Sequence, residues 1–150
     1  KNVDMSLAGT GYAIFSVAML IMRLIGDKTV QLLGEQKAVI GGSLLTAAGF
    51  TLLIALDNIY LNAFAFILIG IGCSNVVPVF YSILKYQKAM PISAAVTSVT
   101  SFGYTGVILG PALLGFIAHG INISAVFELL ALLLIIEAVI AKYVFCKLKM

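Results

Sequence analysis

The sequence has few charged residues and almost no metal-binding or redox side chains, and each shortage excludes a class of protein. Only 10% of the 150 residues are charged, against about 25% in an ordinary soluble domain. One histidine and two cysteines form no zinc or redox motif, and Cys73 and Cys146 fall at different depths of the predicted helices, which argues against a disulfide. No phosphate-binding loop or Gly-x-Ser-x-Gly motif is present. We therefore expect neither an enzyme, nor a cofactor, nor a metal site.

Long apolar runs are what the sequence has instead. Hydrophobic residues make up 62% of the chain, and the mean hydropathy is +1.15. About 20 apolar residues are needed for a helix to cross a bilayer, and five runs reach that length. The runs are continuous rather than alternating, which favours helices over barrel strands. The sequence predicts an all-α, polytopic transmembrane bundle of five helices, spanning residues 5–25, 38–56, 59–84, 92–118 and 123–145.

The basic residues fall on one side of this predicted bundle. When the helices are threaded in order, eight of the nine Lys and Arg residues lie on one side and only Lys1 on the other. The eight are Arg23, Lys28, Lys37, Lys85, Lys88, Lys142, Lys147 and Lys149. Positive charge beside short loops stays cytoplasmic, so we predict a plasma membrane protein of the bacterial inner membrane type, with its N-terminus outside and its C-terminus in the cytoplasm. The asymmetry also accounts for the net charge of +3 and gives no reason to expect nucleic acid as a partner.

The start of the chain does not read as a signal peptide. It begins at Lys1, with no basic segment before the first apolar run and no small-residue cleavage site after it. An outside N-terminus followed by five helices would need an earlier helix for its translocation. We therefore expect one or more helices to precede this chain.

A motif at the end of the first run carries a resemblance to a known family. Arg23-Leu24-Ile25-Gly26-Asp27-Lys28, followed by Gly34, resembles the cytoplasmic loop signature of the major facilitator superfamily. The glycines and proline from Gly103 to Gly115 resemble the eleventh helix of that family, and Gly70 to Pro78 is similar to the tenth helix of its sugar-permease-like branch, to which fucose permease belongs. The resemblance implies that the five runs are helices eight to twelve, with the N-terminal half and helix seven absent.

The resemblance implies a cytoplasmic gate formed by charged and glycine residues. These are Arg23, Gly26, Asp27, Lys28 and Gly34, with the glycines turning a loop sharply and the charges pairing to close the transporter. The sequence departs from the full signature, with Gln31 in place of an aspartate, and Leu32 and Glu35-Gln36 in place of basic residues. The alternative for Arg23 is a side chain that reaches the interface and only marks the end of the helix.

The resemblance implies that the first, third and fourth runs line a substrate cavity, so hydroxyl and amide side chains inside them are candidate substrate-binding residues. Tyr12 and Ser16 share a helical face with Arg23, and Thr97, Ser101 and Tyr104 share one in the fourth run. Asn75 is the most polar uncharged residue near the middle of the third run. The alternative is structural, because hydroxyls within membranes often bond to their own backbone or to a neighbouring helix.

Glycines and prolines predict where helices bend and pack. Pro78 frees a carbonyl one turn earlier, near Ser74, and we expect a bend there. Gly106 and Gly110 form a small-xxx-small pair beside Pro111, and Ser43 with Ala47 forms another, so close packing is expected at both.

Two carboxylates lie inside the last run. Because an ionised carboxylate in a membrane is costly, Glu128 and Glu137 raise the hypothesis of a proton site, with Lys142 as a candidate ion-pair partner of Glu137. The resemblance implies a peripheral position for this last helix, which together with the nearby lysine favours the structural alternative.

Together these patterns predict a secondary carrier for a small, sugar-like solute, working by alternating access. Its partners would be the solute, a co-transported proton, the lipid bilayer and the N-terminal helices of the same transporter. The alternative that composition leaves open is a non-transporting membrane partner or a degenerate transporter remnant.

Overall fold

The computed structural model describes residues 5–56 and 58–148, and every regular element in this part of the chain is helical. The helices are α1 (Met5–Leu33), α2 (Glu35–Ala55), α3 (Ile59–Ser74), α4 (Val76–Ile83), the short 3-10 helix η1 (Leu84–Tyr86), α5 (Ile92–Gly120) and α6 (Ile123–Leu148). Five helical segments are long and apolar enough to cross a membrane. The prediction of an all-α bundle with five spans is confirmed.

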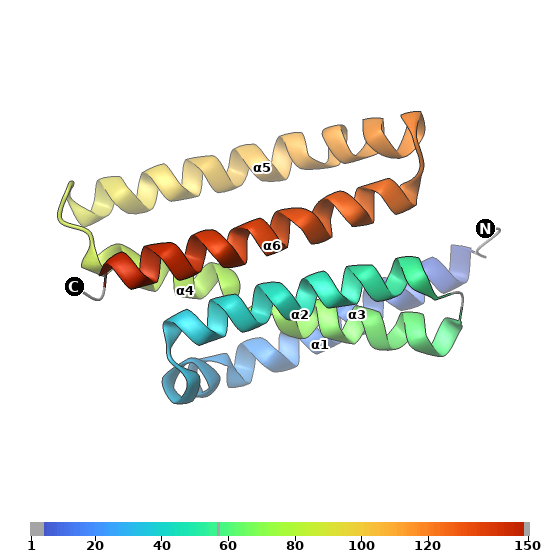
Figure 1. The fold of residues 1–150 in the computed structure, drawn as a ribbon, viewed down its shortest axis with the longest axis horizontal. Helices are drawn as coiled ribbons and strands as arrows, with labels where there is room; N and C mark the ends of the chain where they lie inside the picture. Colours follow the sequence, from blue (N-terminus) through green and yellow to red (C-terminus); the bar gives the residue numbers. More distant parts are fainter. Residues whose placement is uncertain (1–4, 57, 149–150) are drawn as a thin grey trace.

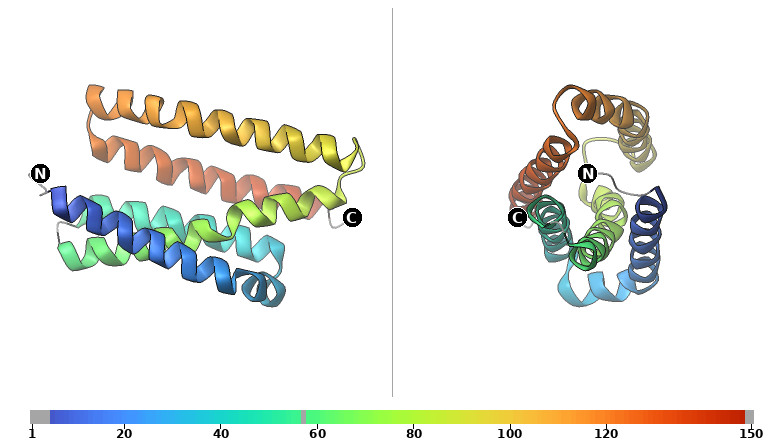
Figure 2. Two further views of the ribbon diagram at one scale, coloured as in Figure 1. Left: turned by 180° about the vertical axis from the view of Figure 1, so that it is seen from behind. Right: turned by 90° about the vertical axis from the view of Figure 1, so that its right-hand side faces the viewer.

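The helices lie side by side as one curved row. Neighbours along the row are α1 and α3, α3 and α2, α2 and α6, and then α6 and α5, as the end-on view in Figure 2 shows. The start of α1 and the end of α6 lie at opposite ends of the bundle, as an odd number of crossings requires (Figure 1). Lys1 and Lys149, which enter the predicted charge asymmetry, lie outside the described residues.

The first helix is longer than its apolar run predicts. α1 continues through the charged segment to Leu33, and Gly34 alone connects it to α2. Gly34 has a φ of 83°, its N–H donates to the Val30 carbonyl at 2.8 Å, and its own carbonyl accepts from Ala38 at 3.0 Å. A positive φ is readily adopted only by glycine, so one residue both ends α1 and starts α2.

Side-chain caps and a glutamine fix the other connections. The Asn58 Oδ1 accepts from the Tyr60 amide at 2.9 Å to start α3, and the Asn122 Oδ1 accepts from the Ala125 amide at 2.7 Å to start α6. In the connection to α5, the Gln87 side chain bonds to the backbone of Ala89 and Met90.

A cluster of buried hydrophobic residues lies near the Gly34 end of the bundle. Ala38 and Val39 of α2 pack there with Val79 of α4 and with Ala141 and Phe145 of α6. By contrast, α5 buries only Ala95 among its residues and exposes large side chains such as Phe102 and Phe116. An apolar, unburied helix of this length suits contact with lipid or with further helices.

Candidate functional site

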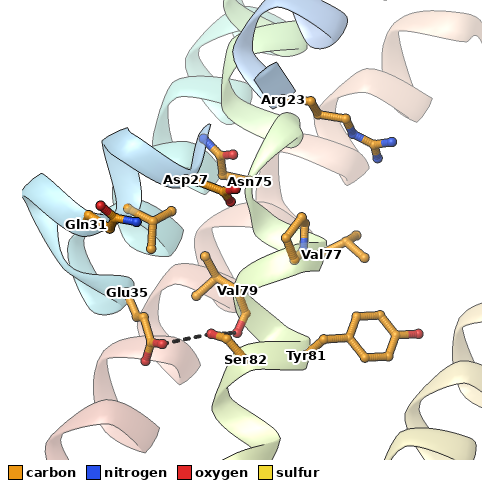
Figure 3. A pocket seen from close by; sticks show the side chains of 11 residues that line it. Arg23, Asp27, Gln31, Glu35, Asn75, Val77, Val79, Tyr81 and Ser82 are labelled. Carbon is orange, nitrogen blue, oxygen red and sulfur yellow. Dashed lines mark hydrogen bonds between the residues drawn. The ribbon is translucent and has the colours of Figure 1, made fainter. Parts of the chain in front are cut away.

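A polar pocket of about 590 Å³ opens near the Gly34 end of the bundle, where α1, α2 and α4 meet (Figure 3). We refer to it as the polar pocket. Its lining combines charged and amide side chains from three helices with apolar residues of α4. The lining residues are Arg23, Asp27, Val30, Gln31, Glu35, Asn75, Val77, Pro78, Val79, Tyr81 and Ser82.

The helix interruption at Asn75 shapes the inner part of this pocket. The third predicted run is divided there into α3 and α4, with Asn75 as the residue between them. Pro78 has no N–H to give to the carbonyl of Ser74, four residues earlier, so one hydrogen bond of the helical ladder is missing next to this interruption. Asn75 and Pro78 both line the polar pocket. The interruption therefore presents an amide side chain to the pocket from the middle of a spanning segment.

Gly26 contacts this interruption from the opposite helix. It lies within α1, so the expectation that it turns a loop is wrong; the charged segment around it is helical up to Leu33. A Cβ at Gly26 would collide with the Oδ1 of Asn75. Its missing side chain therefore lets α1 approach the interruption closely enough for Asn75 to fit.

The charged residues of the predicted gate also lie on α1 rather than in a loop. Arg23 and Asp27 both line the polar pocket, one helical turn apart, whereas Lys28 does not line it. Within the described residues no ion pair joins Arg23, Asp27 and Lys28 to one another. In Figure 3, Asp27 lies near Asn75 while the guanidinium of Arg23 extends away from it. The sequence thus identified two of the pocket's charges, but the pairing expected among Arg23, Asp27 and Lys28 is absent from the described ion pairs.

An ion pair between Glu35, which lines the polar pocket, and Lys85 was not predicted from the sequence. Glu35, in the first turn of α2, accepts from the Lys85 ammonium at 3.1 Å and from the Ser82 hydroxyl at 2.9 Å. The N-terminus of a helix favours a carboxylate, which helps to hold Glu35 in place. The Lys85 ammonium also lies 4.8 Å from the centre of the Tyr86 ring. Glu35 and Lys85 are 50 residues apart, so only their shared end of the bundle could have suggested the pair.

A second link joins the pocket wall to α5. The hydroxyls of Tyr81 on α4 and Thr100 on α5 lie 2.9 Å apart. Thr100 lies beside the predicted stripe, three residues after Thr97 and four before Tyr104, but the sequence analysis did not single it out.

Most of the predicted substrate-binding hydroxyls lie away from the polar pocket. Ser16 donates to the Tyr12 carbonyl at 2.8 Å, and Thr97 donates to the Ser93 carbonyl at 2.9 Å. The Tyr12 and Tyr104 rings are 71% and 67% exposed, and Ser101 is exposed on α5. Of the six candidates, Asn75 alone lines the polar pocket, and substrate contact by the others stays a prediction.

Close helix packing occurs at glycines other than the predicted pair. A Cβ at Gly106 or Gly110 would meet no described atom within 4 Å, and Pro111 lies within the continuous α5, so their packing and bending roles stay predictions. At the crossing of α2 and α3, a Cβ on Gly42 would lie 2.6 Å from the Gly72 carbonyl oxygen. The backbones of α2 and α3 touch here, which fixes α3 and hence the interruption at Asn75.

Comparisons with known proteins agree on one family. The model of the Major Facilitator Superfamily matches residues 1–148. An uncharacterized MFS-type transporter of Yersinia pestis is 42% identical over 144 residues, which cover 96% of this chain and 38% of that protein.

More distant relatives come from rhizobia. The membrane protein MosC of Rhizobium meliloti is 26% identical over 124 residues, covering 83% of this chain and 30% of that protein. An uncharacterized transporter, y4wD, of Sinorhizobium fredii is 29% identical over 140 residues, covering 93% and 37%. The chain thus spans less than two fifths of the length of each relative.

No solved structure matches the chain significantly. The family match covers nearly the whole chain, and the five apolar helices are of the kind that such transporters place in the membrane. This chain belongs to the Major Facilitator Superfamily.

Proposed function

We propose that the protein is a secondary transporter that moves a small, sugar-like solute by alternating access, and that this chain supplies its C-terminal helices. The observation that carries the proposal is the family match over residues 1–148, together with five helices able to span a bilayer. Membership of a transporter family also supports the prediction that the protein is not an enzyme. On this proposal, preceding helices complete the substrate cavity.

The polar pocket is the proposed cytoplasmic gate. Glu35 of α2 lines this pocket and pairs with Lys85 of η1, and the two side chains are 21% and 52% exposed. A partly hydrated ion pair is weak because water screens it, so it can break and re-form during a transport cycle. Asn75 lies deeper, at the helix interruption, where its amide is available to hydrogen-bond a solute hydroxyl.

Charge placement supports the proposed sidedness. The end of α1, the start of α2, η1 and the end of α6 lie together at the Gly34 end of the bundle (Figure 1). Nearly all described basic residues belong to these segments or the loop after η1: Lys28, Lys37, Lys85, Lys88, Lys142 and Lys147. Positive charge favours the cytoplasmic side, so the polar pocket would open to the cytoplasm of an inner membrane.

The test is solute uptake combined with a probe of the gate. The protein would be reconstituted in vesicles and offered a panel of labelled sugars, polyols and other small solutes. In a background lacking native cysteines, Gln31→Cys places a thiol on the exposed pocket lining, and its reaction rate with a membrane-impermeant maleimide reports gate opening. We expect a transported solute to change that rate.

Two matched variants test whether Arg23 acts in the gate or only marks the end of its helix. Arg23→Ala removes a charge that lines the polar pocket, while Lys28→Ala removes an exposed charge of α1 that does not. We expect Arg23→Ala to alter the Gln31→Cys reaction rate several-fold and Lys28→Ala to leave it unchanged. Equal effects of the two variants would refute the gate. Absence of flux for every solute, with stable binding to another membrane protein, would favour the non-transporting alternative.

A further inference from the structure

The carboxyl group of Glu137 lies in the middle of α6, far from both membrane surfaces. At 1.5 Å per residue, it is about 21 Å along the helix axis from Ile123 and about 17 Å from Leu148. The bilayer core is about 30 Å thick, so a helix spanning it places this position well inside. Glu137 is partly buried against the neighbouring helix α2, and its Oε1 atom is fully enclosed.

Within the described residues, the Oε1 atom of Glu137 has no hydrogen-bond partner. The predicted partner Lys142 forms no ion pair with it there, because five residues of a helix turn the two side chains about 140° apart. An ionised carboxylate needs several donors or a cation to replace its water, and a carboxylic acid needs far less. The surroundings therefore fit the neutral acid better than the anion.

No charged group on the packed helices compensates Glu137. The Cys73 thiol of α3 is the titratable group that interacts with it electrostatically, and a thiolate there would repel a carboxylate rather than stabilise it. Within the described residues, no ion pair joins Glu137 to a basic side chain of α2 or α6, where Lys37, Lys142 and Lys147 lie.

Ser43 of α2 is the polar side chain that faces Glu137. It is fully buried, interacts with the carboxyl group, and its hydroxyl donates to the Val39 carbonyl at 3.0 Å. A hydroxyl has one hydrogen and two lone pairs, so in this arrangement Ser43 Oγ is free to accept a hydrogen bond from a protonated Glu137. If the acid ionised, the same hydroxyl could rotate and donate to it. One donor still leaves a membrane-embedded carboxylate poorly satisfied.

We propose that Glu137 is a proton-binding site in the α2–α6 interface, holding a proton at neutral pH and donating it in a hydrogen bond to Ser43 Oγ. A metal cation fits less well, because the described residues gather no group of three ligating side chains. The enclosed Oε1 atom lies where α6 packs against α2, so water or a donor reaches this atom only if that packing loosens. Proton binding and the α2–α6 contact are therefore linked.

The experiment is infrared spectroscopy of the purified protein in lipid vesicles. An ordinary exposed glutamate is ionised at neutral pH, whereas a protonated acid shows a separate carbonyl stretching band. We expect the wild-type protein to show this band at neutral pH, Glu137→Gln to lose it, and the exposed control Glu128→Gln to keep it. Glu137→Gln preserves the size of the neutral acid, so its helical content should be unchanged.

Ser43→Ala tests the hydrogen bond separately. Without the acceptor, the acid band should move to higher frequency, as expected for a carbonyl of a carboxylic acid that no longer donates. A wild-type spectrum without the band at neutral pH, or an identical band in Glu137→Gln, would overturn the proposal. The readout needs no solute, so its failure is distinct from failure of the proposed transport.

Discussion

The close approach of α2 to α3 gives a sharp prediction from two adjacent glycines. Gly41 and Gly42 lie in the same helix, and each would gain helix stability of about 0.5–1 kcal/mol on replacement by alanine. A Cβ at Gly41 would meet nothing within 4 Å, whereas a Cβ at Gly42 would lie 2.6 Å from the backbone oxygen of Gly72. The backbone there cannot move aside as the tip of a side chain would, so α2 and α3 must separate.

The expected difference in stability between the two variants is the steric cost at Gly42 alone. Overpacking of this kind costs about 1–3 kcal/mol, and the gain in helix propensity is common to both variants. We therefore expect Gly42→Ala to be less stable than Gly41→Ala by about 1–3 kcal/mol. Gly41→Ala itself should equal or exceed the wild-type protein.

Reversible unfolding in mixed detergent and lipid micelles, followed by helical circular dichroism, would measure the difference. Because Gly42 faces α3 and Gly41 does not, a thiol probe placed in the polar pocket should also react differently only in Gly42→Ala. Equal stability of the two variants would refute the close crossing of α2 and α3, and with it the placement of the interruption at Asn75.

Three further predictions concern the connections around the pocket. Gly34→Ala should destabilise the protein by about 1–3 kcal/mol in the same unfolding assay, since its φ of 83° is strained for any residue with a Cβ. Tyr81→Phe should cost about 0.5–1.5 kcal/mol, and in a double-mutant cycle with Thr100→Val the two losses should not add, because one hydrogen bond joins the two hydroxyls. Glu35→Gln should speed acylation of Lys85 relative to the other lysines in the same digest, read by mass spectrometry; an unchanged ratio would show that the pair does not persist in solution.

Sequence patterns predicted the helical fold because a segment that crosses a bilayer must satisfy its backbone hydrogen bonds internally, as a helix does. Run length alone located five spans, and the observed helices differ mainly at their ends. The largest difference is at α1, where the charged segment after Ile25 remains helical until Gly34. Hydropathy shows where a helix leaves the lipid but not where the helix itself ends. No residue between Ile25 and Gly34 ends the helical backbone conformation of α1.

Residues of the polar pocket were predictable only where a pattern within one continuous segment of the sequence pointed to them. Arg23, Asp27, Asn75 and Pro78 were singled out and all line the polar pocket. Glu35, Ser82 and Lys85 were not connected, because their contact depends on how α2 meets α4 and η1 in space. The roles of Gly26 and Gly42 likewise follow from what the opposite helix presents, which no pattern within one helix contains.

The single residue between α1 and α2 restricts how the two helices can move. With no spare chain at Gly34, a shift of α1 along its own axis must pull α2 with it, and only rotation about the glycine's two dihedral angles remains. Asp27 and Glu35, on the two sides of that pivot, therefore change their separation mainly by swinging. The hinge between α1 and α2 is therefore a single residue without a side chain, and the two helices that meet there both pack against α3.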